Sequence, residues 1–398
     1  MIWFAGIFSV LFGAIYVVSP KRQKRDLKLV IFLLFVFLAI RFGQEADYFT
    51  YLGIYNSTTP SYKGFFLESY RHVVEPFYYL INIFAKKHEL GFQFVLAFSA
   101  AITCVFNYLS IKEYSDRKLL SVFILLCNYI GYLTNLYRWA IAASIALYAI
   151  LKYNDNNKLG QYLVFIAFAS MFHTSAIVLL LIPVIVWLKV DFTGTARYAI
   201  AAIFCYIGSY FAFPLIIFVA GKINPRYYLY STQIHNWNFL PCLVRLTFAL
   251  FAMYYYRRYR NYISEKNKGL IRLYLLGSLI YFLLSSSMQA ARISDYFTYL
   301  EIIIFPNIFM TIPANRRKKN AVFGALLLGF LVMFTKEIVT AEVQGNYISR
   351  NPLKYPYITI FNKEDIFDYR LNLKKFGVSI TDLNYAHVEK IECQNIKC

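Results

Sequence analysis

Helix-length apolar runs recur along the first 340 or so residues of the chain, and short polar clusters bound each of them. A helix of about 20 apolar residues satisfies every backbone hydrogen bond internally, which a hydrocarbon environment requires. Only 16% of the residues are charged, whereas about a quarter are charged in a soluble domain. The sequence therefore predicts an all-α, polytopic integral membrane bundle of about 12 transmembrane helices.

The apolar runs also set the expected helix boundaries. We expect helices at 2–18, 27–41, 92–111, 118–134, 138–153, 159–172, 174–190, 197–220, 240–256, 269–287, 293–312 and 320–338. The further apolar segment 76–86 is too short to cross about 30 Å of hydrocarbon. Its aromatic residues and the following Lys86 and Lys87 favour a short helix that lies flat at the interface.

Basic residues orient the chain. The formal net charge is +20, but the lysines and arginines cluster in short loops, which indicates membrane topology and not nucleic-acid binding. With 76–86 lying flat, the inner loops hold more than twice as many basic residues as the outer loops. The first apolar run precedes its basic cluster, so we expect a retained helix and no cleavable signal. Both termini are expected outside.

The domain organisation follows from this topology. We expect one transmembrane domain over 1–338, with outer loops at 42–91 and 221–239, and an extracytoplasmic tail over 339–398. The sequence has no Cys/His cluster with metal-ligand spacing, so neither a metal nor another cofactor is expected.

Three arginines at outer helix ends are not explained by the positive-inside rule. Arg41 ends one apolar run, and Arg138 and Arg292 begin two others, where a cation opposes the helix dipole. Guanidinium groups bind diphosphate oxygens in pairs, so these residues suggest an anionic lipid headgroup, such as a lipid-linked diphosphosugar. The structural alternatives are snorkelling of Arg41 and a surface ion pair between Arg292 and Asp295.

Three candidate acid–base residues lie in the same outer segments. Asp47, Glu75 and His173 each could orient or deprotonate a hydroxyl group. Helix capping for the two acids and an isolated interfacial histidine are the structural alternatives. The remaining candidates for substrate binding are polar or aromatic residues of these outer segments: Tyr48, Gln289, Tyr296 and Arg226.

Six segments, in their order along the chain, resemble the EpsG-like branch of the Wzy-type polysaccharide polymerases. They are RFGQEADYF, the segment around Glu75, YRWAIAASIAL, FHTSAIVLL, ARISDYF and KYPYITI, and they extend to about residue 360. The family acts in O-antigen, capsule or exopolysaccharide assembly. The resemblance implies a membrane architecture like that of the GT-C class and an inverting, metal-independent glycosyltransferase in the bacterial inner (plasma) membrane.

The resemblance also implies a substrate. A growing glycan would move from undecaprenyl diphosphate to the non-reducing end of a lipid-linked repeat unit on the outer face of the membrane. The three arginines would hold the diphosphate, and Asp47, Glu75 or His173 would act on the acceptor hydroxyl, with the choice among them open. A chain-length regulator and a flippase are the expected protein partners.

Two other function classes remain open. A lipid-linked oligosaccharide flippase or other transporter predicts polar residues near helix midpoints, and Arg245 inside 240–256 suits that reading. A membrane O-acyltransferase of surface glycans predicts a His or Asp–His arrangement near an inner acyl-CoA entry. The candidate histidine, His173, is instead expected outside.

Overall fold

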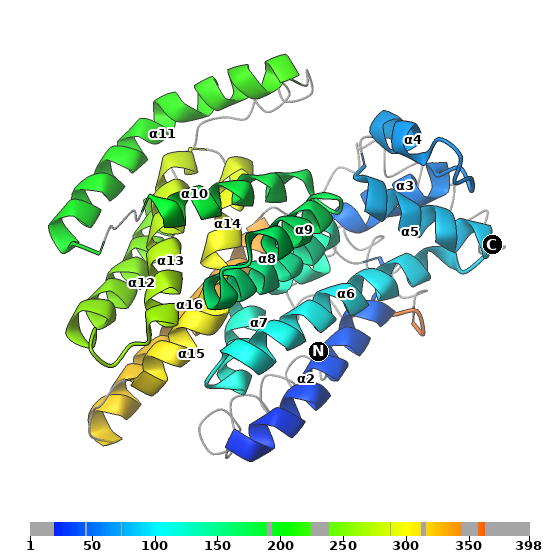
Figure 1. The fold of residues 1–398 in the computed structure, drawn as a ribbon. Helices are drawn as coiled ribbons and strands as arrows, with labels where there is room; N and C mark the ends of the chain where they lie inside the picture. Colours follow the sequence, from blue (N-terminus) through cyan, green and yellow to red (C-terminus); the bar gives the residue numbers. More distant parts are fainter. Residues whose placement is uncertain are drawn as a thin grey trace.

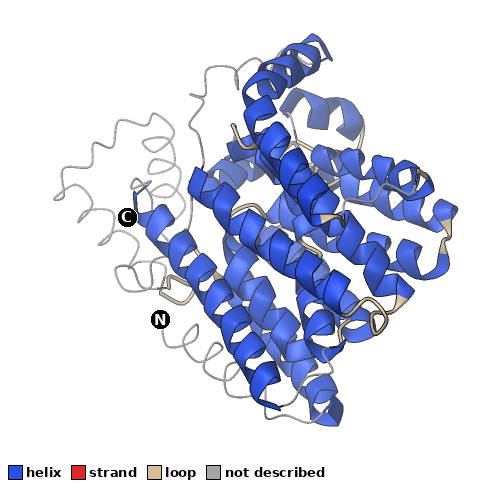
Figure 2. Cartoon of the chain, turned by 90° about the vertical axis from the view of Figure 1, so that its left-hand side faces the viewer, coloured by secondary structure: helices blue, strands red, loops and turns tan. Residues whose placement is uncertain are grey.

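The computed structural model is a helical bundle (Figure 1). It describes residues 20–43, 46–72, 74–188, 193–223, 239–286, 288–311, 316–343 and 357–362. Every element named within these ranges is a helix (Figure 2). Extended backbone pairs within the same ranges in one isolated antiparallel bridge, between Arg41 and Thr359. The all-α fold class is therefore confirmed for the described residues.

The helices follow most of the expected apolar runs. They are α2 (Pro20–Ile40), α3 (Ala46–Ser57), α4 (Phe65–His72), α5 (Pro76–Lys87), α6 (Gly91–Tyr114), α7 (Lys118–Thr134), α8 (Tyr137–Asn156), α9 (Leu159–Ser170), the 3-10 helix η1 (Thr174–Leu181), α10 (Ile182–Trp187), α11 (Thr195–Ile223), α12 (Phe239–Arg258), α13 (Glu265–Leu284), α14 (Met288–Thr298), α15 (Glu301–Thr311) and α16 (Arg316–Val343). The expected helix 2–18 and most of the expected tail lie outside the described residues.

Two of the described helices, α6 and α13, are long and apolar enough to cross a membrane. Shorter apolar stretches lie in α7, α9, η1 with α10, and α16. The expected number of about 12 spans is therefore not established. Helix α5 has 12 residues and a length of about 18 Å, less than the hydrocarbon thickness.

Three expectations about helix boundaries were wrong. The expected outer loop 42–91 contains two helices that were not expected, α3 and α4, besides α5, which matches the short helix expected over 76–86. The expected helix 174–190 is divided into η1 and α10, where Pro183 lacks the N–H that would continue a regular helix. The expected helix 293–312 is divided into α14 and α15, because Leu300 N bonds to Phe297 O and the turn tightens to a three-residue spacing.

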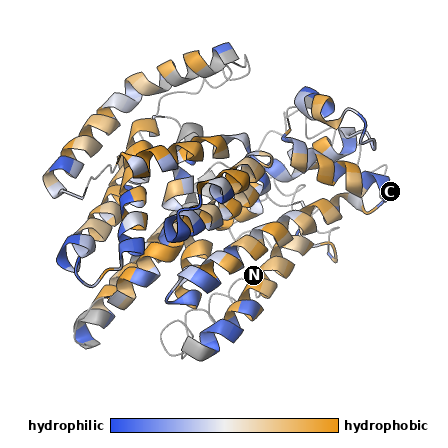
Figure 3. Cartoon of the chain, viewed as in Figure 1, coloured by the Kyte–Doolittle hydropathy of each residue, from blue (hydrophilic) through white to orange (hydrophobic). Residues whose placement is uncertain are grey.

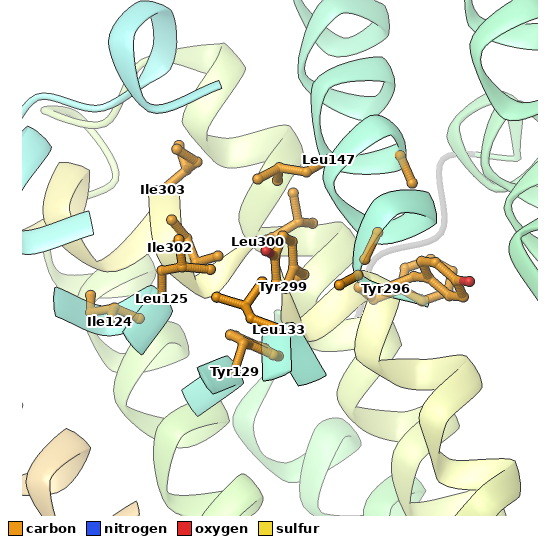
Figure 4. Close-up of a cluster of buried hydrophobic side chains, with 14 of the residues drawn as sticks. Ile124, Leu125, Tyr129, Leu133, Leu147, Tyr296, Tyr299, Leu300, Ile302 and Ile303 are labelled. Atoms are coloured by element: carbon orange, nitrogen blue, oxygen red, sulfur yellow. The ribbon is translucent and has the colours of Figure 1, made fainter. Parts of the chain in front are cut away.

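The centre of the bundle is α7, whose residues are buried almost without exception. Figure 4 shows its side chains packed against those of α8, α14 and α15; the labelled residues are Ile124, Leu125, Tyr129, Leu133, Leu147, Tyr296, Tyr299, Leu300, Ile302 and Ile303. Helices α13 and α14 also approach closely, since a Cβ on Gly277 would clash with the Cβ of Phe297. Small residues allow such close approach between membrane helices.

The bundle has two polar ends. Apolar residues follow the helices for much of their length, and hydrophilic residues gather toward the helix ends and loops (Figure 3). Residues of three expected inner loops and of the adjoining helix ends line one cavity of about 570 Å³; they fall within 113–116, 151–155, 262–270 and 307–311. Helices α3, α4 and α5, which were expected outside, lie at the opposite end (Figure 1).

Candidate functional site

Five of the candidate site residues lie together at the end of the bundle formed by α3, α4 and α5. They come from the first turn of α3, the residue before α5, the first turn of α8, the residue before η1, and α14: Asp47, Glu75, Arg138, His173 and Arg292. The charges of Arg138 and Arg292 act on Asp47. The same two arginines and Glu75 act on His173. Residues up to 245 positions apart in the sequence are therefore close enough in the fold for their charges to interact.

Glu75 joins three of these segments. Its Oε2 accepts a hydrogen bond from Arg138 Nη1, and the pair is partly buried, with 13% of the Glu75 side chain and 20% of the Arg138 side chain exposed. Its Oε1 accepts from the backbone N and the Oγ1 of Thr174, at 3.2 and 3.4 Å. The side chain does not cap α5. Both carboxylate oxygens are therefore engaged, and Glu75 positions Arg138 and the start of η1.

Arg138 lies among aromatic rings. Its guanidinium is 5.3 Å from the ring centre of Tyr51 and 5.8 Å from that of Tyr78. Such cation–π contacts stabilise a guanidinium away from water. Its Nε is buried and has no hydrogen-bond partner among the described residues, and a buried donor without a partner costs about 1–3 kcal/mol. The arginine therefore keeps a donor for a further acceptor group.

Arg292 and Asp47 carry charges that the described residues do not neutralise directly. Neither side chain forms an ion pair or a side-chain hydrogen bond within the described part of the chain, although the backbone N of Asp47 donates to Asn135 Oδ1 at 2.9 Å. Burial raises the pKa of Asp47, and the charges of Arg292 and Arg138 act in the opposite direction. An unengaged carboxylate with a raised pKa is suited to accept a proton.

His173 belongs to a hydroxyl chain. Its Nδ1 is 2.6 Å from Ser175 Oγ, and Ser175 Oγ is 2.9 Å from the hydroxyl of the buried Tyr296. Burial lowers the pKa of His173 to about 4, with the nearby arginines acting in the same direction and Glu75 against it. The imidazole is therefore neutral near pH 7 and can accept or relay a proton but adds no positive charge.

The pKa of His173 predicts how stability depends on pH. Unfolded histidine binds a proton near pH 6.5, whereas folded His173 does so near pH 4. The unfolded state therefore binds more protons between these values, and stability should fall as the pH drops from about 6.5 to 4. His173→Gln should reduce this slope in thermal unfolding of the detergent-solubilised protein, while the exposed His88→Gln should not. Equal slopes in the wild type and His173→Gln would contradict the prediction.

Arg41 differs from the other arginines. It is only 1% exposed, its Nη1 donates to Leu133 O at 2.9 Å, and its guanidinium lies 4.2 Å from the ring centre of Tyr137. The backbone of the segment around Thr359 pairs with this end of α2. The arginine therefore packs inside the bundle and does not snorkel to an interface. It supports Tyr137, the residue before Arg138.

The remaining candidates have varied surroundings. Tyr48 is buried and packs on Phe42 and Phe92, with ring centres 5.7 and 5.4 Å away. Arg226 and the side chain of Gln289 lie outside the described residues.

Sequence reasoning missed a buried charged cluster next to this site. Arg245 of α12 pairs with Glu301 at 2.8 Å and with Asp295 at 3.5 Å, and Glu301 is completely buried. The hydroxyl of Tyr274 and Nδ2 of Asn128 donate to Glu301 at 2.9 and 2.7 Å. The structural alternative of a surface ion pair between Arg292 and Asp295 does not describe this arrangement, because Asp295 is buried and pairs with Arg245. The sequence signal that could have indicated this cluster is the presence of charged residues inside the expected apolar helices 240–256 and 293–312.

The comparisons with known proteins give one match. The model of the EpsG family matches residues 27–358, a range that contains all five clustered site residues. No curated protein and no solved structure matches the chain.

Proposed function

Because the chain belongs to the EpsG family of polysaccharide-polymerase-type membrane proteins, we propose that it is a glycosyltransferase that extends a lipid-linked glycan. The observation that carries the proposal is the meeting of two guanidinium groups, of Arg138 and Arg292, with the unengaged carboxylate of Asp47. The donor is a glycan on undecaprenyl diphosphate, and the acceptor is the non-reducing sugar of a lipid-linked repeat unit. The reaction takes place at the outer face of the bacterial inner membrane, where a chain-length regulator and a flippase act with it.

The arginines act on the donor diphosphate. Arg292 has no direct partner among the described residues, and the buried Nε of Arg138 has none, so both offer hydrogen-bond donors to phosphate oxygens. As the bond from the anomeric carbon to the diphosphate breaks, negative charge develops on the leaving oxygen. Fixed positive charges stabilise that oxygen more in the transition state than in the bound donor, and no metal ion is required for this role. Arg41 contributes indirectly, because it holds Tyr137 at the start of α8.

Asp47 is the proposed general base. Of the three candidates, Glu75 uses both oxygens for Arg138 and Thr174, and Nδ1 of His173 is engaged with Ser175. Asp47 takes the proton of the acceptor hydroxyl while that oxygen attacks the anomeric carbon from the face opposite the leaving diphosphate. One C–O bond forms as the other breaks, the configuration inverts, and undecaprenyl diphosphate leaves.

The proposal is tested by analysing lipid-linked glycans in a deletion strain that carries either the wild type or a variant. The wild type should restore long chains, and Asp47→Asn should slow polymerisation by about 10²–10⁴-fold and leave single repeat units on the carrier. Asp155→Asn, at the other end of the bundle, is the matched control and should restore long chains. Normal chain lengths without the protein would overturn the proposed function, and normal chain lengths with Asp47→Asn would overturn the role of Asp47.

A lipid-linked oligosaccharide transporter is the second candidate, and the buried cluster of Arg245, Asp295 and Glu301 favours it, since charges inside the bundle suit a transport pathway. The same strains distinguish the two functions. Loss of a transporter would confine repeat units to the inner leaflet, whereas loss of a polymerase leaves single units that reach the outer face. Unchanged chain lengths with missing acyl groups would instead identify an O-acyltransferase.

A further inference from the structure

A second, uniformly basic cavity lies between the start of α11 and the end of α12. Its volume is about 270 Å³, and it is lined by Thr193, Gly194, Arg197, Tyr256, Arg257 and Arg260. These residues belong to the expected inner loops, away from the cluster near α3, α4 and α5 (Figure 1). The cavity therefore does not belong to the glycosyltransferase site.

Three guanidinium groups line this cavity, and none of them forms an ion pair with an acid among the residues that the structure describes. Arg257 Nη1 donates to Thr195 Oγ1 at 2.6 Å, while Arg197 and Arg260 form no ion pair within the described part of the chain. Glu265, the acid whose charge interacts with Arg260, is paired with Lys268 at 2.7 Å. Like charges that share a cavity repel one another, so an anion bound among them is stabilised. Planar guanidinium groups bind phosphate oxygens in pairs.

The first turn of α11 adds to the same positive potential. The first backbone N–H groups of a helix have no partner within the helix, and the helix dipole is positive at that end. Thr195 begins α11, and Gly194, directly before it, lines the cavity. The backbone and the three arginines therefore favour the same kind of ligand, a phosphate group.

An apolar stripe leads away from the cavity along α11. At helical spacing from Arg197, it presents large exposed side chains that are 52–72% accessible: Ile200, Ile203, Phe204, Ile207 and Phe211. Residues spaced by three or four positions lie on one face of a helix. From Ile200 to Phe211 the stripe spans about 17 Å, long enough to accompany an acyl chain through one leaflet of about 15 Å. Figure 3 shows the predominantly apolar character of α11.

We propose that the cavity binds the phosphate of an anionic membrane phospholipid whose acyl chains lie along this stripe. The basic cavity matches the headgroup, and the stripe matches the chains, which a free phosphate lacks. Clusters of arginines beside membrane helices favour anionic headgroups in this way. The bound lipid would hold α11 against the end of α12.

Thermal unfolding of the purified full-length protein in detergent tests the proposal. Titration with phosphatidylglycerol should raise the Tm, whereas phosphatidylcholine and inorganic phosphate at the same concentrations should have little effect. Arg260→Gln, at an exposed loop position, should weaken the apparent affinity for phosphatidylglycerol about fivefold. The triple variant with Arg197→Gln and Arg257→Gln added should lose the Tm increase.

Arg258→Gln is the matched control. Arg258 is an exposed arginine in the last turn of α12, beside Arg257, but it does not line the cavity. Its replacement removes one positive charge, as Arg260→Gln does, and should leave lipid binding unchanged. Equal weakening by Arg258→Gln and Arg260→Gln would reduce the effect to general surface charge and overturn the proposal. An equal Tm increase with phosphatidylcholine, or with inorganic phosphate, would overturn the assignment to an anionic lipid. Because these readouts do not depend on glycan synthesis, they are independent of the proposed function.

Discussion

Arg138→Ala should abolish long glycan chains and leave single repeat units on the lipid carrier. We expect a loss of at least about 10²–10³-fold in polymerisation rate, the effect of removing a donor that stabilises developing negative charge. Arg138→Lys should recover only part of the activity, because an ammonium group lacks the planar pair of donors that a phosphate accepts. The measurement is the chain-length distribution of lipid-linked glycans at matched expression of each variant.

The partner of Arg138 distinguishes a catalytic role from a structural one. Glu75→Gln keeps the size of the side chain and the hydrogen bond to Thr174 but removes the charge that Arg138 faces. If Glu75 positions Arg138, the Arg138→Ala/Glu75→Gln double variant should be no worse than Arg138→Ala alone. Arg71→Ala is the control, because Arg71 is an exposed arginine of α4 paired with Glu68 at 2.6 Å. Wild-type chain lengths in Arg138→Ala would contradict the assignment.

Five of the ten candidate residues lie together at one end of the bundle, and the reason that the sequence singled them out is electrostatic. Charges at the outer ends of apolar runs have no topological role, so their types and positions indicated a site before any contact was known. Asp47, Glu75, Arg138, His173 and Arg292 do lie together. Their separate roles could not be predicted, because the engagement of both Glu75 oxygens depends on where α8 and η1 begin relative to α5.

The surroundings of Arg41 could not be predicted from the sequence. An arginine at the end of an apolar run is normally free to reach the interface. Here the short segment 357–362, more than 300 residues later, covers this end of α2: Tyr357 stacks on Phe37 with ring centres 4.3 Å apart, and Ile360 N donates to Ile40 O at 3.0 Å. A contact between such distant segments has no local pattern in the sequence. It encloses the guanidinium, which lies over the ring of Tyr137.

The break between α14 and α15 was also not encoded in hydropathy. A continuous apolar run predicted one helix over 293–312, but the turn at Tyr299 and Leu300 separates Asp295 from Glu301 and leaves both buried. Both acids then contact Arg245 from a different part of the chain. The position of α14, and with it that of Arg292, therefore depends on a charge cluster that becomes visible only in three dimensions.

Arg245→Met should destabilise the protein by about 3–5 kcal/mol, the cost of removing one partner from a buried ion pair. It removes the cation that pairs with Asp295 and with Glu301, which is completely buried. Arg245→Met/Glu301→Gln should recover much of this loss, because the glutamine oxygen still accepts a hydrogen bond from Asn128 or Tyr274 and the side chain carries no uncompensated charge. Arg258→Met, an exposed change at the end of the same helix, should alter stability by no more than about 0.5 kcal/mol.

The readout is the free energy of unfolding in mixed detergent, measured alongside glycan chain length for the same variants. If the cluster positions α14, Arg245→Met should lower polymerisation even at a temperature where it stays folded, since Arg292 and Tyr296 lie on α14. The double variant should regain stability before it regains full activity, because the ion pair between Arg245 and Asp295 is still lost. A stable Arg245→Met with normal chain lengths would mean that the cluster neither stabilises the bundle nor positions the site. A stable Arg245→Met that accumulates repeat units in the inner leaflet would support the transporter instead.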